Sequence, residues 1–197
     1  MQNIVNEIEN HIKKNKNMIA NKPPSYIFDI RLGNSISNNV MKIDIGPQAF
    51  SKLFKTLKED YKYKYLINKI YKHEDFEYVV DLLNDHIKCN KNIYFNQTDA
   101  TIGNRDFRLV IREKKRINTG YFSCKQSYNN EFLREILSFD IEDRLKLNLI
   151  LRRSVADTDE DEIKNYEGNL VYFYNADKHK TDKINAIKKV LKLLSSF

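Results

Sequence analysis

Residues 144–152 read RLKLNLILR and show the clearest two-residue alternation in the chain. Leucine occupies one set of alternate positions, and the other set carries Arg144, Lys146 and Arg152 together with one asparagine and one isoleucine. Successive side chains of a β-strand point to opposite faces of the sheet, so this pattern predicts a strand with an apolar face and a cationic face. The fold therefore has to bury the leucine face and leave the cations on the other side of the sheet.

The same alternation appears in three other stretches, at residues 26–32, 107–112 and 121–126. In the first of these, large apolar side chains alternate with a face that carries Asp29 and Arg31, until a Gly-Asn pair ends the run. Together with residues 144–152, these stretches place a set of cations on the polar strand faces: Arg31, Arg108, Arg112, Lys125, Arg144, Lys146 and Arg152.

Helical spacing of apolar residues predicts four helices. They cover residue 1 to about residue 20, residues 47–59, residues 75–87 and residues 183–195. The prolines at positions 23 and 24 end the first helix, and Pro47 suits the first position of the second. Further strands are expected at residues 61–71 and 170–174, where apolar and polar residues alternate over shorter stretches.

These elements predict an α+β fold with a mostly antiparallel sheet and flanking helices. The sheet is either open or closed into a tunnel-like β-barrel. No internal repeat or low-complexity linker divides the chain. We therefore expect a single domain over residues 1–197, in which a helix within residues 1–22 packs on a body formed by residues 26–197.

The charge balance points to a polyanionic partner. The chain has 34 Lys and Arg residues against 27 Asp and Glu residues, a net charge of +7. AT-rich coding favours lysine, asparagine and isoleucine whatever the function of the protein, so part of the lysine excess needs no functional explanation. Arginine is not favoured in this way and binds phosphate with two donors, so the arginines are the better indicator of a polyanionic partner. The five glycines form no glycine-rich phosphate loop, which excludes nucleotide binding of that kind.

Location is predicted from what the sequence lacks. No stretch approaches the roughly 20 apolar residues of a membrane span, and the first residues lack the apolar core of a signal peptide. Cys89 and Cys124 have no partner at the spacing of metal ligands. We expect an intracellular protein in a reducing compartment, with no membrane partner.

Cations at every second position of a strand lie about 6.5 to 7 Å apart, which suits the oxygens of a polyphosphate or of a nucleic-acid backbone. Several such strands would form a basic platform or a basic channel. The alternative is an ordinary antiparallel sheet with one face in water. Acidic residues are almost absent from these faces, which favours a binding role.

Other candidate sites are weak. His73 and His86 have no convergent third metal ligand, and Cys124 is expected to be a core residue. The acidic run at residues 159–162 lacks the spacing of a calcium loop and is interpreted as a solvated segment.

Several segments resemble the RNA 5′-triphosphatases of the triphosphate tunnel metalloenzyme family, of the type found in large DNA viruses and fungi. Residues 26–33, YIFDIRLG, followed by the apolar helix at 47–59, resemble the opening of these enzymes. Residues 107–111 and 142–148 resemble later strands of the family, and residues 170–197 resemble its last strand and helix. The matching motifs are short and cover about a third of the chain.

The resemblance implies an antiparallel barrel with a cationic lumen. Arginines and lysines of the lumen bind the triphosphate, and clusters of glutamates bind Mg²⁺ or Mn²⁺. Carried over to this sequence, the resemblance assigns phosphate contacts to Arg31, Arg108, Lys125, Arg144 and Lys146, and it makes Asp29 a metal ligand.

The sequence departs from the family in its carboxylates. Ile27 and Asp29 stand where the first strand of the family has paired glutamates, and residues 171–174, VYFY, stand where the last strand has another pair. The same barrel occurs without its glutamates in non-enzymatic subunits of transcription complexes. The departure therefore leaves open whether the chain is a metal-dependent phosphohydrolase or a binding protein.

The predicted function is binding of the 5′-triphosphate end of RNA, as in mRNA capping, or of another polyphosphate, with hydrolysis if Mg²⁺ or Mn²⁺ is held. Two alternatives stay open. One is an inactive relative that acts as a protein-interaction subunit of a viral, capping or transcription assembly. The other is a general RNA- or DNA-binding protein that uses a basic sheet face. The resemblance implies the cytoplasm or a viral factory as the location.

Overall fold

A computed structural model describes residues 1–15, 26–36, 40–117, 130–154, 164–174 and 181–196. The elements, in chain order, are α1 (Gln2–Asn15), β1 (Tyr26–Ile36), β2 (Val40–Lys42), α2 (Gly46–Asp60), β3 (Tyr63–His73), β4 (Phe76–Asp81), β5 (His86–Ile102), β6 (Arg105–Ile117), β7 (Asn130–Glu142), β8 (Leu145–Ser154), β9 (Lys164–Tyr174) and α3 (Thr181–Leu194).

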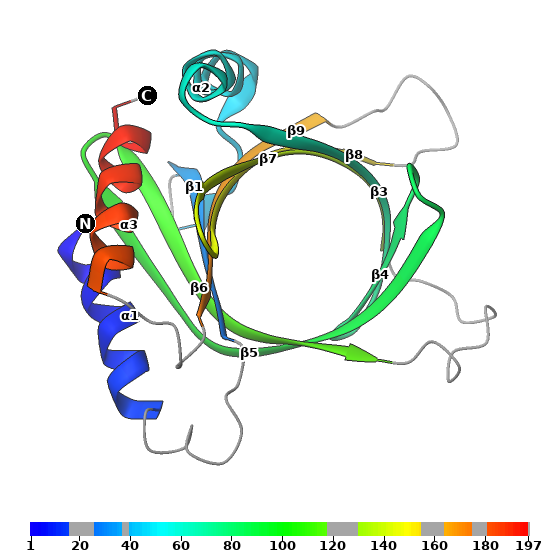
Figure 1. The fold of residues 1–197 in the computed structure, drawn as a ribbon, viewed down its shortest axis with the longest axis horizontal. Helices are drawn as coiled ribbons and strands as arrows, with labels where there is room; N and C mark the ends of the chain where they lie inside the picture. The colour runs from blue at the N-terminus through cyan, green and yellow to red at the C-terminus, as the bar shows by residue number, and fades with distance from the viewer. Residues whose placement is uncertain (16–25, 37–39, 118–129, 155–163, 175–180, 197) are drawn as a thin grey trace.

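The strands of the described residues form an antiparallel sheet that closes on itself. Its order is β1-β6-β5-β4-β3-β7-β8-β9, and β9 pairs with β1 to complete the ring (Figure 1). β2 extends the far end of β1. The predicted α+β fold is confirmed, and of the two predicted arrangements of the sheet, the closed barrel is the one observed.

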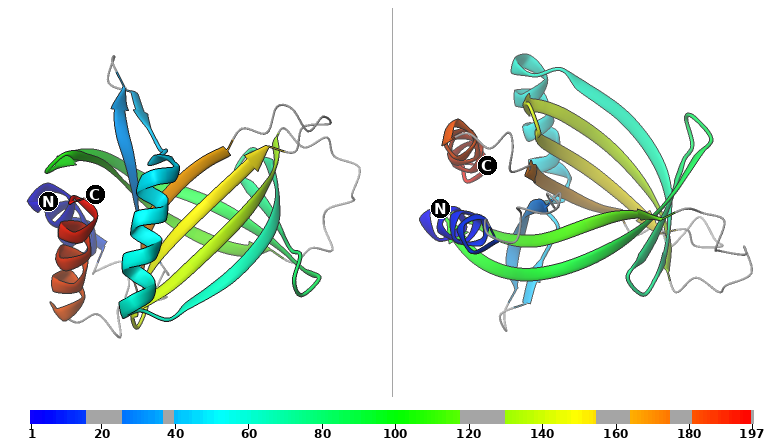
Figure 2. Two further views of the ribbon diagram at one scale, coloured as in Figure 1. Left: turned by 90° about the horizontal axis from the view of Figure 1, so that it is seen from above. Right: turned by 60° about the horizontal axis from the view of Figure 1, so that its bottom comes forward.

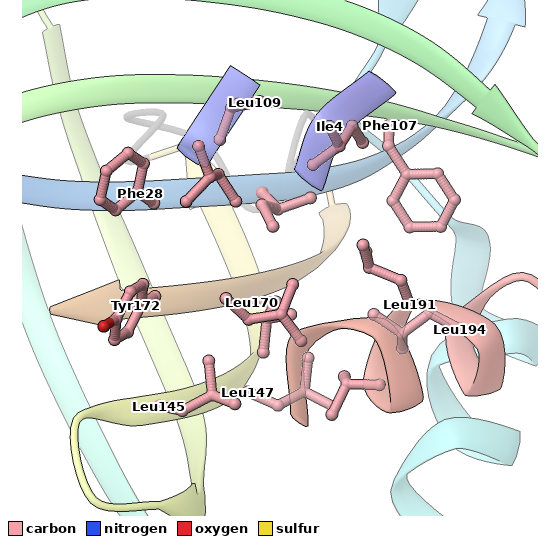
Figure 3. Close-up of a cluster of buried hydrophobic side chains, with 14 of the residues drawn as sticks. Ile4, Phe28, Phe107, Leu109, Leu145, Leu147, Leu170, Tyr172, Leu191 and Leu194 are labelled. Carbon is pink, nitrogen blue, oxygen red and sulfur yellow. The ribbon is translucent and has the colours of Figure 1, made fainter. Parts of the chain in front are cut away.

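The apolar strand faces point outward, and helices cover them. α1 and α3 lie side by side against one side of the barrel (Figures 1 and 2). Figure 3 shows the resulting core, in which Phe28 and Leu170 of the wall meet Ile4 of α1 and Leu191 of α3, all of them buried. Leu145, Leu147 and Leu149 of β8 belong to this cluster, as the alternation at residues 144–152 predicts.

α2 covers a second part of the outer wall, next to β9 and β7. Leu53 and Leu57 are buried, and the ring of Phe54 packs against that of Phe139 at 6.3 Å between centroids. The helices thus cover the apolar outer faces of these strands, so the strand faces that line the interior can carry polar and charged residues. The inward positions follow from strand alternation and register, because paired residues in a sheet project to the same face.

The helix predicted at residues 75–87 is wrong. β4 and the start of β5 occupy this segment, joined by a turn in which Asp85 has φ of 51°. Leu83 and Ile87 belong to the apparent helical stripe but are 54% and 58% exposed. The segment is rich in valine and aromatic residues, which favour strands, and its pairing with β3 on one side and β5 on the other satisfies the backbone.

Most of the other helices and strands predicted from the sequence are confirmed. The strand expected at residues 61–71 is confirmed as β3, and the helices at 47–59 and 183–195 are confirmed as α2 and α3. The first helix is confirmed to Asn15, beyond which its predicted end lies outside the described residues. The last strand, expected at 170–174, begins six residues earlier, at Lys164. Among the described helices, none is both long and apolar enough to span a lipid bilayer.

Candidate functional site

Charged side chains meet inside the barrel, on the face opposite to the apolar core. We call the following residues the central cluster: Asp29, Arg31, Lys72, Glu77, Arg112, Lys114, Arg134, Arg152 and Glu167. They come from β1, β3, β4, β6, β7, β8 and β9, and ion pairs or electrostatic interactions connect them.

Interactions across the ring show that the cluster occupies the interior. Lys72 on β3 and Arg31 on β1 lie on opposite sides of the strand order. Burial lowers the pKa of the Lys72 ammonium, Glu77 opposes this shift, and Arg152 and Arg31 add to it. Cations from distant strands therefore act on one another through the middle of the barrel.

The first part of the cluster is built on Asp29, whose side chain is only 2% exposed. Its Oδ2 atom accepts hydrogen bonds from Arg31, at 2.8 Å from Nη2 and 3.1 Å from Nε. Arg112 also donates to Oδ2, at 3.4 Å from Nη2, and its Nη1 donates to Asn92 Oδ1 at 2.9 Å. Asp29 thus holds two guanidinium groups side by side.

The second part is built on Glu77 of β4. Its Oε1 atom lies 3.3 Å from Lys114 Nζ and 3.7 Å from Arg134 Nη2. Burial alone would raise the pKa of this carboxyl, but Lys114, Arg134 and other cations outweigh burial and lower it to about 2. Burial lowers the pKa values of Lys114 and Arg134 in turn. Glu77 is therefore the ionised anchor of two partly desolvated cations.

The third part joins β8 and β9. Arg152 Nη2 lies 2.8 Å from Glu167 Oε1, and the Arg152 guanidinium also stacks 4.5 Å from the centroid of the Phe132 ring. Burial raises the pKa of the Glu167 carboxyl, against the effect of Arg152. Burial therefore makes ionisation of Glu167 less favourable, and a bound anion would compete with its carboxylate for Arg152.

Cations outnumber anions in the central cluster by six to three, a net charge of +3. Three guanidinium donors, the Nε atoms of Arg112, Arg134 and Arg152, are buried and have no hydrogen-bond partner among the described residues. The Arg112 and Arg152 side chains still reach water, at 15% and 34% exposure. Unused donors and excess positive charge suit an anionic ligand with several oxygens.

Of the residues predicted to bind phosphate, Arg31, Arg112 and Arg152 lie in this cluster. Arg108 is paired with Arg31 across β1 and β6 and is held by Asp99 through two bonds of 2.8 Å. Lys146 lies apart from the cluster contacts, 3.0 Å from Asp140.

Of the two remaining predicted residues, the structure describes one, Arg144, and does not bring it into the cluster. Arg144 lies in the turn between β7 and β8, with φ of 64°, and its Nε is 3.8 Å from Asp143. The prediction that it continues the cationic face of the following strand is therefore wrong, because the strand begins only at Leu145. Lys125 lies outside the described residues.

Sequence reasoning did not identify five members of the cluster: Lys72, Glu77, Lys114, Arg134 and Glu167. Glu77 fell in the segment misassigned as helix, and Glu167 lay before the predicted start of the last strand. Lys114 had a usable signal, because it continues the alternation of Arg108 and Arg112 on β6. The others become recognisable only once the sheet closes.

Solved structures of RNA triphosphatases have the same architecture. The structure of the S. pombe Pct1 RNA triphosphatase in complex with the Spt5 CTD matches with a TM-score of 0.73 at 11% identity, covering 97% of this chain and 91% of that chain. The Mimivirus capping enzyme triphosphatase matches with a TM-score of 0.61 at 12% identity, covering 100% and 99%. No family model and no curated protein sequence matches the chain.

The chain has the triphosphate tunnel fold. The fold resemblance inferred from the motifs is therefore confirmed, and the interior of the barrel corresponds to the tunnel. At 11–12% identity the likeness shows the fold alone, so the ligand of the tunnel has to be argued from its residues.

The described carboxylates of the tunnel do not gather into the cluster that the family resemblance implies for a divalent metal. The described residues contain no group of three His, Cys, Asp or Glu side chains that could hold a metal ion. The three carboxylates of the central cluster each face a cation. Buried oxygens without a hydrogen-bond partner among the described residues include Asp29 Oδ1, Asn165 Oδ1 and Asn169 Oδ1. Mg²⁺ is usually held by one or two carboxylates together with waters and phosphate oxygens, and the carboxylate of Asp29 already lies beside two guanidinium groups. The predicted role of Asp29 as a metal ligand is not tested by this arrangement.

Proposed function

We propose that the tunnel binds a polyphosphate, and that its natural ligand is the 5′-triphosphate end of RNA. The observation that carries the proposal is the central cluster, in which six cations surround three carboxylates and leave guanidinium donors unused. Guanidinium groups match phosphate oxygens in both charge and geometry. A triphosphate, with closely spaced oxygens and several negative charges, suits this interior better than a single phosphate.

An enclosed site favours a chain end over a continuous nucleic-acid backbone. The cations lie on the inside of a closed ring of strands, where a double helix does not fit. A nucleic acid binding through its backbone would instead need cations on an outer, accessible face. The likeness in fold to RNA triphosphatases supports the same ligand class, a triphosphate-ended RNA.

The test is a comparison of two RNAs of one sequence, one ending in a 5′-triphosphate and the other in a 5′-hydroxyl. We expect the triphosphate end to strengthen binding by about 100-fold at physiological salt, which corresponds to about 2.7 kcal/mol and to one or two new charge-assisted contacts. Fluorescence anisotropy with labelled RNA measures both affinities. Equal affinities with a steep salt dependence would instead indicate general nucleic-acid binding.

An aromatic residue next to the cluster favours a nucleotide over inorganic polyphosphate. Tyr94 of β5 is paired with Arg112 of β6, so both side chains project to the same face. A β-bulge follows Tyr94, between it and Asn96, and the residue is 56% exposed. An electrostatic interaction also links Tyr94 to Arg31 of the cluster. An exposed ring beside phosphate-binding cations can stack on a nucleobase.

Replacing Tyr94 with Ala should therefore weaken binding of triphosphate-ended RNA by about tenfold, as expected for one lost base–aromatic stack. Binding of inorganic tripolyphosphate should change less than about twofold, because it has no base. Tyr65→Ala is a matched control, since Tyr65 is an exposed tyrosine on the outer face of β3 that hydrogen-bonds Glu135. Similar losses for both ligands would show that Tyr94 supports the cluster and does not contact a base.

A further inference from the structure

We propose that the tunnel neutralises its polyphosphate with protein cations alone, without a bridging divalent metal ion. This inference rests on the proposed function for its ligand and concerns only how the charge of that ligand is balanced. It differs from what the family resemblance implies, in which carboxylates hold a metal that contacts the phosphates.

The carboxylates of the tunnel are already engaged. Arg31 and Arg112 share one oxygen of Asp29, at 2.8 and 3.4 Å. Lys114 and Arg134 share one oxygen of Glu77, at 3.3 and 3.7 Å. A metal ion bound at either carboxylate would lie next to two fixed positive charges, which repel it in a partly desolvated interior.

The remaining carboxylate, Glu167, is engaged as well, with Arg152 at 2.8 Å. Burial raises the pKa of its carboxyl group, and Arg152 opposes this effect and holds the ionised form. The family's arrangement of paired glutamates would supply several oxygens at one point. Here the three carboxylates of the cluster come one each from β1, β4 and β9. Asp29 and Glu167, on the paired strands β1 and β9, both interact with Arg31, so a protein cation already acts on both carboxylates.

Among the described residues, the buried atoms of the cluster without a hydrogen-bond partner are three donors and one acceptor, the carboxylate oxygen Asp29 Oδ1. The buried Nε atoms of Arg112, Arg134 and Arg152 lack partners among the described residues, and all three are donors. A phosphate oxygen satisfies such a donor directly, whereas a metal ion cannot. The net charge of +3 is also close to the charge of a triphosphate, so protein cations suffice to neutralise most of the ligand.

Isothermal titration of the full chain with inorganic tripolyphosphate tests the proposal, once in excess EDTA and once with Mg²⁺ or Mn²⁺. We expect the affinity in EDTA to equal or exceed the affinity with metal, because metal ions compete with the protein cations for the ligand. An affinity at least tenfold lower in EDTA would overturn the inference while leaving the proposed function intact. Failure of tripolyphosphate and triphosphate-ended RNA to bind under either condition would overturn the proposed function itself.

Glu167→Gln gives a result of opposite sign for the two mechanisms. With protein cations alone, removing a negative charge beside Arg152 should strengthen tripolyphosphate binding by about tenfold or more, because a unit charge even about 12 Å from the ligand has a tenfold effect at an effective dielectric of about 20. If Glu167 held a metal ion, the same change would weaken binding and abolish any effect of Mn²⁺. Glu135→Gln on the outer face, where Glu135 pairs with Arg153, is the matched control and should change nothing.

Discussion

Replacing Arg112 with Gln should weaken tripolyphosphate binding by about 10- to 100-fold. Arg112 reaches Asp29 and Asn92 with its two terminal nitrogens and leaves its buried Nε donor unused. A phosphate oxygen at this donor would make a charge-assisted hydrogen bond, which contributes about 1.5 to 3 kcal/mol. Glutamine keeps much of the length of the side chain but removes the charge and the fork of donors. Isothermal titration of both proteins measures the effect.

Arg144→Gln is the matched control, because the sequence assigns both arginines to phosphate binding and the structure separates them. Arg144 lies in the β7–β8 turn, where its nearest ion-pair distance is 3.8 Å, to Asp143. Its replacement removes the same unit charge from the protein as a whole but none from the central cluster. An equal loss of affinity in both variants would mean that net charge alone attracts the ligand, and the tunnel would lose its assigned role.

The strands of the barrel wall could be predicted wherever one face is apolar and the other polar. Residues 26–32 and 145–152 alternate with only Ile27 and Ile150 as exceptions, because one face packs on helices and the other lines a charged interior. A one-residue change of register would turn Asp29 towards α1 and turn Phe28 away from the core, so the pattern of apolar and polar residues fixes the pairing register of this strand. The fold class and the sidedness of these strands follow from this local signal.

The segment at residues 75–87 shows where local signals fail. The spacing of its apolar residues fits one face of a helix, but the spacing of Phe76, Tyr78 and Val80 also fits one face of a strand. Pairing of β4 with β3 and β5 decides between the two, and that information lies in other parts of the chain. The wrong helix assignment hid the inward position of Glu77 on its strand. Its ion-pair partners, Lys114 and Arg134, come from strands far away in sequence, so no local pattern connects the three residues.

The composition of the central cluster could not be read from the sequence for a related reason. A closed barrel collects single residues from many strands, and each contributes only one or two charges. Lys72 and Arg134 are ordinary charged residues in sequence, and their position becomes special only because β3 and β7 close the ring. The cationic character of the site was predictable from Arg31 and Arg112, whereas its carboxylate partners were not.

Replacing Glu77 with Gln should lower the free energy of unfolding by about 3 kcal/mol at neutral pH. The pKa of Glu77 falls from 4.5 to about 2 in the folded protein, and each pKa unit corresponds to about 1.4 kcal/mol. The reason is that Lys114 and Arg134 would be left partly buried without their shared anion. Urea denaturation measures the loss. Glu131→Gln, which breaks the exposed pair with Lys69, should cost less than about 1 kcal/mol.

The pH dependence of this effect has a definite sign. Because the folded-state pKa is depressed, the stabilisation by Glu77 is fully present above its ordinary pKa of 4.5 and is lost as the pH falls towards 2. The difference between the unaltered protein and Glu77→Gln should therefore shrink in acid, and a constant difference would contradict the ion-pair explanation. Tripolyphosphate should restore more stability to the variant than to the unaltered protein, because the bound anion takes the place of the missing carboxylate beside Lys114 and Arg134. Equal stabilisation of the two proteins would place the ligand away from these cations.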